Sequence, residues 1–233
     1  MLLKELYKPL EEYPKATKKQ IWEEGDIGSR MSSQGSFSVA YNHATNPNLI
    51  IKIIETPYPS KDGYLNYLER IKRQNLPTNP QIEYIKEYNL LDDNGNTTGR
   101  YLFKICMERL QRAERLSGKQ IEALLNRYFG DMINKYSDTR EFVQEYSYPE
   151  RLFAKFLAAI IFKESDWFED KALRPFFRMK INDIRDPYLR KIAHIIRAQD
   201  KKGFGRDLHS GNIMFRLTPY GPQPVVTDPF TYR

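Results

Sequence analysis

The spacing of hydrophobic residues along the chain changes near residue 110. Before this point, short apolar runs alternate with clusters of turn residues, a pattern typical of β-strands. The expected strands are residues 36–41, 49–54, 82–90 and 101–107. The last two flank Asp92-Asp93-Asn94-Gly95-Asn96, which predicts a hairpin turn. One helix is expected over about 62–73, because Leu65, Leu68 and Ile71 recur at helical spacing.

After residue 110 the apolar residues recur every three or four positions, which predicts amphipathic helices. Ser117 with Gln120, and Ser147 with Glu150, form the pattern of a capping box at two helix starts. A further helix is expected over about 187–199. The apolar stripes of these helices are expected to form a hydrophobic core and not a cofactor site. Together with the strands, they predict an α+β fold.

Length and composition suit one two-lobed domain or two small domains, with 233 residues of which 40% are hydrophobic. We expect a strand-rich part over 1–110, including an N-terminal extension, and a helical part over 111–233. No apolar stretch approaches the roughly 20 residues of a membrane span. The first residues lack the pattern of a secretory signal. The single cysteine, Cys106, excludes an intramolecular disulfide and fits a reducing cytoplasm.

Positive charge is concentrated in one segment. The chain carries a net charge of +7, and residues 171–206 hold eleven Lys and Arg against Asp183, Asp186 and Asp200. This segment is either a solvated helix surface or a basic face for nucleotide phosphates, an acidic protein or nucleic acid. Zinc-finger spacing, aromatic RNA-binding signatures and a basic tail are all missing, so direct nucleic-acid binding is not expected.

The residues most informative about chemistry lie near the C-terminus, in Gly205–Phe215 and Val225–Pro229. Asp207 and Asn212 are five positions apart in a turn, and Asp228 follows a short apolar strand. Phosphoryl transfer from ATP needs one carboxylate to orient the attacking hydroxyl, plus an amide and a carboxylate to hold magnesium. The pattern therefore predicts a kinase-like active site.

In these residues the sequence resembles the protein-kinase-like superfamily, in which an arginine–aspartate pair opens the catalytic loop. The resemblance implies that Arg206 and Asp207 form this pair and that Asp207 orients the substrate hydroxyl. It also implies that Asn212 and Asp228 bind magnesium. His209 lies where many protein kinases place a lysine near the γ-phosphate, and it is either a donor to that phosphate or a structural histidine of the turn. The implied fold is a compact, atypical bilobal kinase.

The resemblance also implies an ATP site in the first half of the chain. Lys52, within the apolar run Leu49–Ile54, corresponds to the lysine that contacts the α- and β-phosphates of ATP. Its expected partner is Glu69 on the helix, in preference to Glu55 on the same strand. The alternative is an edge-strand lysine that faces solvent. The backbone around Gly35 and Ser36 is expected to cradle phosphate.

The end of the fourth expected strand resembles the segment that binds adenine in the family. Met107 is expected to lie behind the adenine, and the backbones of Glu108 and Leu110 to hydrogen-bond its edge. The family's Asp-Phe-Gly motif is altered, because Pro229 and Phe230 follow Asp228. The carboxylate is retained, whereas the conformational switching assigned to the Phe is not implied.

Two narrower resemblances compete. The loop from Asp207 to Asn212 is similar to that of aminoglycoside and choline phosphotransferases, which act on small molecules. A longer match resembles the early-gene serine/threonine protein kinases of autographivirus-type podophages. It consists of Gln34–Tyr41, Asn46–Asn48, His209–Phe215 and Thr227–Pro229. This match implies a phage protein that uses ATP and magnesium, in the host bacterial cytoplasm, to phosphorylate host proteins of transcription and translation.

Five residues follow Asp228, so the activation segment and the helices behind it are expected to be missing. Arg206, which in the family often pairs with a phosphorylated activation loop, would then have no such partner, and activity would not need that phosphorylation. Two alternatives stay open: a small-molecule phosphotransferase, and a pseudokinase that binds a host factor through the basic face. Retention of Lys52, Asp207, Asn212 and Asp228 together argues against the pseudokinase.

Overall fold

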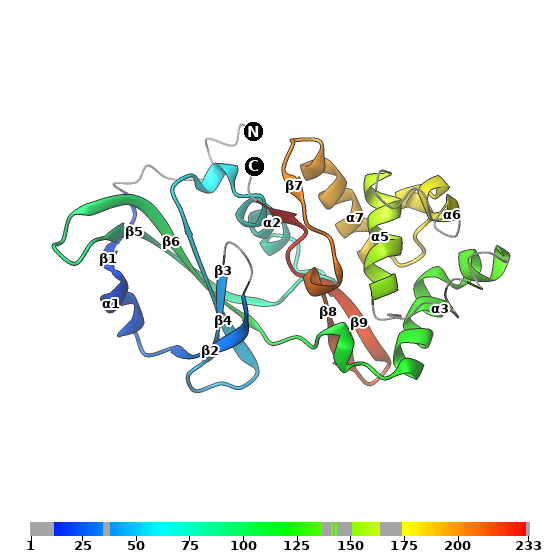
Figure 1. The fold of residues 1–233 in the computed structure, drawn as a ribbon, viewed down its shortest axis with the longest axis horizontal. Helices are drawn as coiled ribbons and strands as arrows, with labels where there is room; N and C mark the ends of the chain where they lie inside the picture. Colours follow the sequence, from blue (N-terminus) through cyan, green and yellow to red (C-terminus); the bar gives the residue numbers. More distant parts are fainter. Residues whose placement is uncertain are drawn as a thin grey trace. The chain divides into compact units, whose positions relative to one another are not determined.

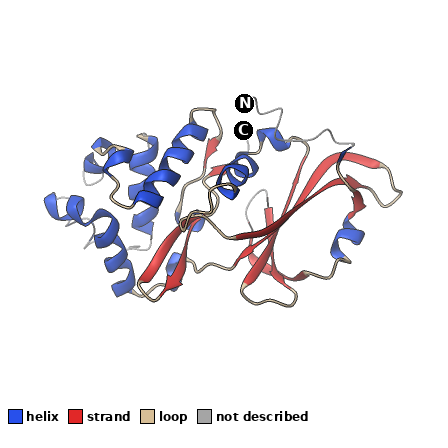
Figure 2. Cartoon of the chain, turned by 180° about the vertical axis from the view of Figure 1, so that it is seen from behind, coloured by secondary structure: helices blue, strands red, loops and turns tan. Residues whose placement is uncertain are grey.

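The computed structural model describes residues 12–34, 38–136, 141, 143, 151–163 and 174–231 (Figure 1). It has an α+β fold with a six-stranded mixed sheet and several helices. The chain divides into two units. The first comprises residues up to Lys72 together with Pro80–Arg109 and the chain from Thr231, and the second comprises Arg73–Asn79 and Leu110–Phe230. Figure 2 shows most strands in the first unit and most helices in the second.

The first unit is built on the six-stranded sheet. Its strands are β1 (Lys15–Thr17), β2 (Ile27–Gln34), β3 (Ser38–His43), β4 (Leu49–Thr56), β5 (Ile82–Leu91) and β6 (Thr97–Glu108). They lie in the order β1-β5-β6-β4-β3-β2. Only β1 is parallel to its neighbour, β5. The other neighbouring pairs are antiparallel. Strand β4, which carries Lys52, is therefore an interior strand.

Alternation along β4 separates two faces of this sheet. Ile51 and Ile53 point to one face and join a buried cluster that includes Ile21 of α1 (Lys18–Trp22) and Cys106. Helix α1 begins at Thr17 with a capping box. Lys52 points to the opposite face, where its Nζ reaches Tyr64 of α2 (Gly63–Lys72).

The four strands expected in the first half are confirmed, with ends shifted by a few residues. The first two positions of the expected 36–41 strand lie outside the described residues. The helix expected over 62–73 is confirmed as α2, after the short helical turn η3 (Pro59–Lys61), and Asp62 Oδ1 accepts a hydrogen bond from Leu65 N at 2.9 Å. The sequence patterns missed β1, α1 and β2. Strand β2 was missed because it is mostly polar and lacks a two-residue apolar period.

The second unit contains the remaining described elements, except that Thr231 of the last strand belongs to the first unit. Its helices are η4 (Ala113–Arg115), α3 (Gly118–Lys135), α5 (Leu152–Phe162), α6 (Arg174–Arg178), η7 (Ile181–Asp183), α7 (Pro187–Asp200) and η8 (Ser210–Asn212). Its strands are β7 (Gly205–Arg206), β8 (Ile213–Thr218), β9 (Gly221–Val226) and β10 (Phe230–Thr231). The strands form two ladders, β8 with β9 and β7 with β10.

Aromatic side chains form the core of the second unit. Phe156 of α5 stacks on Phe176 of α6, with ring centroids 3.9 Å apart. Phe129 of α3 packs against Phe153 of α5 at 5.1 Å, and Phe153 reaches Phe215 of β8 at 6.1 Å. The apolar stripes predicted from helical spacing thus meet in one core, which also supports β8, the strand that follows Asn212.

The helix predictions for this unit are confirmed where residues are described. Ser117 and Gln120 form the capping box of α3, and Asp186 caps α7. Ser147 and Glu150, the second predicted box, lie outside the described residues, and α5 is described from Leu152. Within the part of the chain that the structure describes, no helix is long and apolar enough to cross a membrane.

Segment 73–79 belongs to the second unit, although it precedes the boundary expected at residue 110. Arg216 of β8 donates from Nη1 to Pro77 O at 2.6 Å and from Nη2 to Asn79 O at 3.1 Å. Val226 N of β9 donates to Thr78 O at 3.1 Å. These hydrogen bonds hold the segment along the β8–β9 hairpin.

Candidate active site

The β8–β9 hairpin brings the two ends of the predicted motif together. Ile213 of β8 pairs with Val226 of β9, so the residues just outside the hairpin, Asn212 and Thr227, face each other. Thr227 donates to Asn212 O twice, from its backbone N at 2.9 Å and from Oγ1 at 3.0 Å. Asp228 is the next residue. The hairpin register therefore determines how close Asp228 comes to Asn212.

Asp207 is held from two directions. Its backbone N donates to Pro229 O at 3.0 Å. Its side chain and carbonyl accept from Asn212 Nδ2, at 2.9 Å to Oδ2 and 2.7 Å to the backbone O. Asp207, Asn212 and the residue after Asp228 are thus joined by hydrogen bonds within the second unit, as the spacing in the sequence predicted for a single loop.

The orientation of the Asn212 amide follows from these contacts. Asn212 Nδ2 donates to two oxygens of Asp207 and also lies 3.1 Å from His209 Nε2, so the amide oxygen Oδ1 points away from that carboxylate. Among the described hydrogen bonds, none uses Asn212 Oδ1. An amide oxygen beside a carboxylate is a ligand pair that suits a hard cation such as Mg²⁺.

The described residues contain no group of three His, Cys, Asp or Glu side chains that could hold a metal ion by themselves. Magnesium at phosphotransfer sites takes only one or two protein carboxylates and completes its shell with phosphate oxygens and water. Asn212 and Asp228 fit that smaller ligand set. The roles assigned to them stay predictions.

His209 closes the loop on itself. Its Nδ1 accepts a hydrogen bond from Gly211 N at 3.0 Å, so a neutral ring carries its proton on Nε2. Nε2 lies 3.4 Å from Asp207 Oδ1. A Cβ at Gly211 would come within 2.8 Å of His209 Cε1, so only glycine fits there without displacing the ring. His209 therefore stabilises this turn through Gly211. A role as a donor to phosphate stays a prediction.

Lys52 lies half-buried on β4 between Ala40 of β3 and Ile105 of β6. The alternative of an edge-strand lysine is therefore wrong. Its Nζ is 3.7 Å from the centroid of the Tyr64 ring, a cation–π contact with α2. This contact directs the lysine toward the helix that also carries Glu69.

Glu69 is half-buried on α2, but the ion pairs of the described residues do not include one between Lys52 and Glu69. The expectation that this pair is formed in the protein without nucleotide is not met. Glu55 is excluded as the partner, because it pairs with Lys18 and Arg100, each at 2.7 Å. Glu55 points to the face opposite Lys52, as alternation along a strand requires.

Of the other predicted ATP-site residues, three are described by the structure and two are not. Gly35 and Ser36 lie outside the described residues. Met107 is buried in β6, and Leu110 is buried in the second unit. The Glu108 N–H donates to Gln81 O at 2.9 Å, and Glu108 Oε1 accepts from Gln81 N at 2.8 Å. The Glu108 N–H is therefore already engaged within the first unit.

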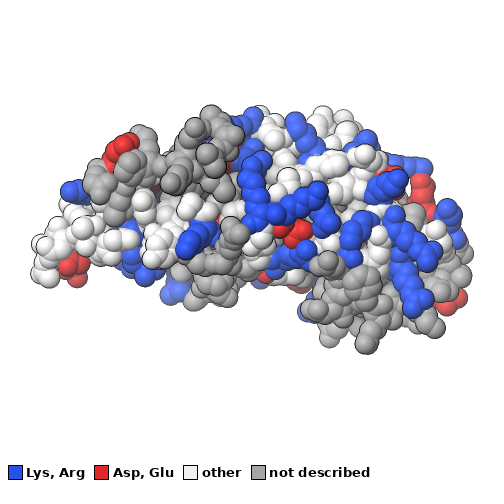
Figure 3. Space-filling view, turned by 90° about the horizontal axis from the view of Figure 1, so that it is seen from above, with Lys and Arg blue, Asp and Glu red and all other residues white. Residues whose placement is uncertain are grey.

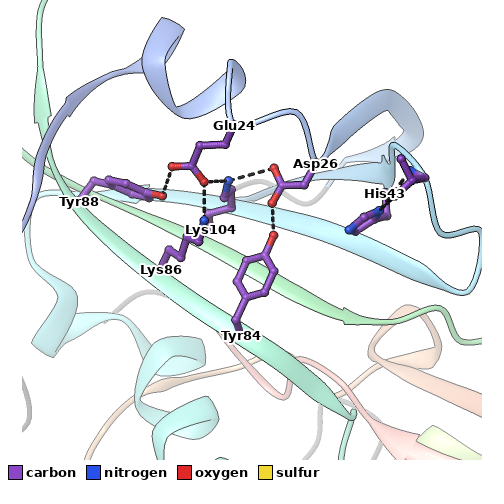
Figure 4. Close-up of polar contacts among 8 residues, drawn as sticks. Glu24, Asp26, His43, Tyr84, Lys86, Tyr88 and Lys104 are labelled. Carbon is purple, nitrogen blue, oxygen red and sulfur yellow. Dashed lines mark hydrogen bonds and ion pairs between the residues drawn. The ribbon is translucent and has the colours of Figure 1, made fainter.

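A polar network on the sheet of the first unit was missed by sequence reasoning (Figure 4). Lys104 of β6 has no exposed surface, and its Nζ contacts Glu24 Oε2 and, at 2.9 Å, Asp26 Oδ1. Lys86 Nζ donates to the same Glu24 oxygen at 2.7 Å, and Tyr88 Oη donates to Glu24 Oε1 at 2.5 Å. Tyr84 Oη donates to Asp26 Oδ2.

Charges in this network stabilise one another. Burial raises the pKa of Glu24, but hydrogen bonds from Lys104, Lys86 and Tyr88 outweigh it and lower the pKa to about 2. Burial also raises the pKa of Asp26, but hydrogen bonds from Tyr84 and Lys104 outweigh this effect, so the pKa is lowered. Burial and the neighbouring carboxylates raise the pKa of Tyr84 and Tyr88. In the sequence, only the charged Lys104 within a mostly apolar strand could have indicated this network.

In the described part of the basic segment, residues 174–206, most Lys and Arg side chains are exposed. Asp183 accepts from Lys180 N at 2.7 Å, and Asp186 accepts from Leu189 N at 2.7 Å. Asp200 pairs with Arg197 and Arg206. All three carboxylates of the segment are therefore engaged locally. On the face seen in Figure 3, Lys and Arg side chains are more prominent than Asp and Glu.

Models of known protein families do not match the chain, and a search of curated proteins finds no similar sequence.

Proposed function

We propose that this protein is a phosphotransferase with a protein-kinase-like site that uses ATP and magnesium. The proposal rests mainly on a group of hydrogen-bonded residues in the second unit. Asp207 is bound by the amide of Asn212, and the backbone of Asn212 is bound by Thr227, next to Asp228. The set provides one carboxylate for a hydroxyl, and an amide oxygen and a second carboxylate for a cation.

Each residue has a distinct role in this proposal. Asp207 would orient the acceptor hydroxyl and take up its proton, with Oδ2 held by Asn212 and Oδ1 facing His209. Asn212 Oδ1 and the carboxylate of Asp228 would hold magnesium. When bound, the ion would neutralise charge on the transferring phosphate. Lys52 would bind ATP phosphates and Glu69 would pair with it once nucleotide is present.

The narrower proposal concerns the acceptor. The sequence resemblance to phage early-gene kinases supports serine and threonine of host bacterial proteins as acceptors, with the protein acting in the host cytoplasm. A small-molecule acceptor is the second candidate. It is supported by His209, which closes a compact Asp-x-His-x-x-Asn loop through Gly211.

One experiment separates these candidates. The purified protein is incubated with magnesium and ATP labelled on the γ-phosphate, in parallel with a bacterial lysate and with a panel of aminoglycosides and amino alcohols. Labelled protein bands that disappear in Asp207→Asn support the protein kinase. Label only in the small molecules supports the second candidate. ATP binding without transfer to any acceptor would reject both and favour a pseudokinase that binds a host factor.

A further inference from the structure

A buried carboxylate lies at the end of α7, close to the proposed catalytic loop. Asp200 has 7% of its side chain exposed and accepts from two arginines. Arg206 donates from Nε to Oδ1 at 2.5 Å and from Nη2 to Oδ2 at 3.2 Å. Arg197 donates from Nη1 to Oδ2 at 3.0 Å. Bidentate arginine–carboxylate pairs are the strongest and most directional ion pairs in proteins.

The same group of residues ties three elements together. Arg197 Nη1 also donates to Phe162 O at the end of α5, at 3.1 Å. The Arg206 guanidinium carbon lies 5.0 Å from the centroid of the Phe162 ring. Asp200 therefore links the C-terminal end of α5, the C-terminal end of α7 and the strand β7.

Arg206 directly precedes Asp207, so a single peptide bond separates this ion pair from the proposed catalytic carboxylate. The backbone of Asp207 is held on its other side by Pro229 O. If Asp200 lost its charge, Arg197 and Arg206 would lose the carboxylate that they share. Arg206 would then move away from Arg197, and the start of the loop would move with it.

We propose that Asp200 is a positioning residue, which acts through Arg206 to hold Asp207 in place for phosphoryl transfer. This inference rests on the proposed function. It implies that an internal carboxylate orders the catalytic loop, so that the unmodified chain needs no added phosphate to order it.

The test compares Asp200→Asn with Asp186→Asn. Both carboxylates belong to α7, but Asp186 caps its N-terminus and does not contact the loop. A displacement of about 1 Å at a catalytic group can lower a rate by about 100-fold. We expect Asp200→Asn to lower kcat at least 10-fold with little change in KM for ATP. Asp186→Asn should leave kcat near that of wild type, because asparagine caps a helix about as well as aspartate.

A compensating pair tests whether the carboxylate acts through Arg206. Asp200→Glu lengthens the anion and Arg206→Lys shortens the cation, so the double variant should regain part of the kcat lost in each single variant. Equal loss of kcat in Asp200→Asn and Asp186→Asn would reduce Asp200 to a stabilising residue. Retention of kcat within twofold in Asp200→Asn would also overturn the inference. So would a wild-type protein that phosphatase treatment inactivates and rephosphorylation restores.

If wild-type protein transfers no phosphate at all, the proposed function fails, but the positioning role is still testable. Amide hydrogen exchange over residues 205–212 would be measured for both variants. Faster exchange in Asp200→Asn and unchanged exchange in Asp186→Asn would support the role of Asp200 in ordering the loop. Unchanged exchange in both variants would overturn it.

Discussion

Replacing Lys104 by methionine should strongly destabilise the first unit. The side chain of Lys104 has no exposed surface and its Nζ contacts both Glu24 and Asp26. Methionine retains most of the volume and removes the charge, so the main effect is the loss of a buried cation from two carboxylates. Removing one partner of a buried ion pair costs about 3–5 kcal/mol.

The structure places the expected cost at the lower end of this range. Glu24 and Asp26 are 28% and 17% exposed, so solvent partly compensates for the lost charge. Lys86 and Tyr88 still donate to Glu24, and Tyr84 still donates to Asp26. We therefore expect the free energy of unfolding to fall by about 3 kcal/mol at neutral pH.

The matched control is Lys86→Met. Lys86 contacts the same oxygen of Glu24 but is 47% exposed. An exposed ion pair contributes only about 0–1 kcal/mol, so this variant should lose less than about 1 kcal/mol. Denaturant titrations can follow the fluorescence of Trp22, which packs against Tyr41 in the first unit, in a background with Trp167→Phe.

The pH dependence gives a second, independent readout. The pKa of Glu24 is about 2 in the folded protein and 4.5 as a free group, so its contribution is complete above pH 4.5 and is lost as pH falls toward 2. Much of this shift comes from Lys104. The difference between wild type and Lys104→Met should therefore shrink between pH 4.5 and pH 2. A difference that is independent of pH, or below about 1 kcal/mol at pH 7, would refute this account of the network.

Three further predictions concern the proposed site. Asp207→Asn should lower phosphoryl transfer by about 100-fold or more while ATP affinity, measured by calorimetry, stays near that of wild type; normal turnover would remove Asp207 from the mechanism. Lys52→Met should raise the dissociation constant for ATP, and Glu69→Gln should do so less strongly, since Lys52 already contacts α2 through a ring and not through Glu69. Gly211→Ala should lower the melting temperature and kcat, because the added Cβ would lie 2.8 Å from His209 Cε1, and the change should be milder in a His209→Ala background if the ring is the obstacle.

The repeating apolar patterns identified most of the secondary structure without knowledge of the fold. The run Leu49–Ile54 predicted β4, and the stripe from Ile121 to Ile133 predicted α3. Strand β2 was missed because its hydrogen bonds to β3, and not its polar side chains, make it a strand. Pairing with a neighbour is a property of the sheet that a single polar segment does not reveal.

Only the local part of the candidate site could be predicted from the sequence. Asp207 and Asn212 lie in one turn, so local spacing was enough to expect them together. The tertiary structure adds that Asn212 Nδ2 donates to Asp207, and that Thr227 holds the Asn212 backbone across the hairpin. The ion pair between Asp200 and Arg206 also escaped prediction, although the two are six residues apart, because a segment with eleven cations does not indicate which one a carboxylate selects.

By itself, the sequence determined the α+β composition of this protein, the order of most of its strands and helices, and the spacing of the residues proposed for phosphoryl transfer. These are local properties, set by side-chain periodicity and by turn and capping residues. Only the tertiary structure decided that Lys104 is buried between Glu24 and Asp26, about eighty residues away in the chain. It also decided that Lys52 lies on an interior strand. Burial and charge pairing depend on which distant segments come together, and no local pattern specifies that.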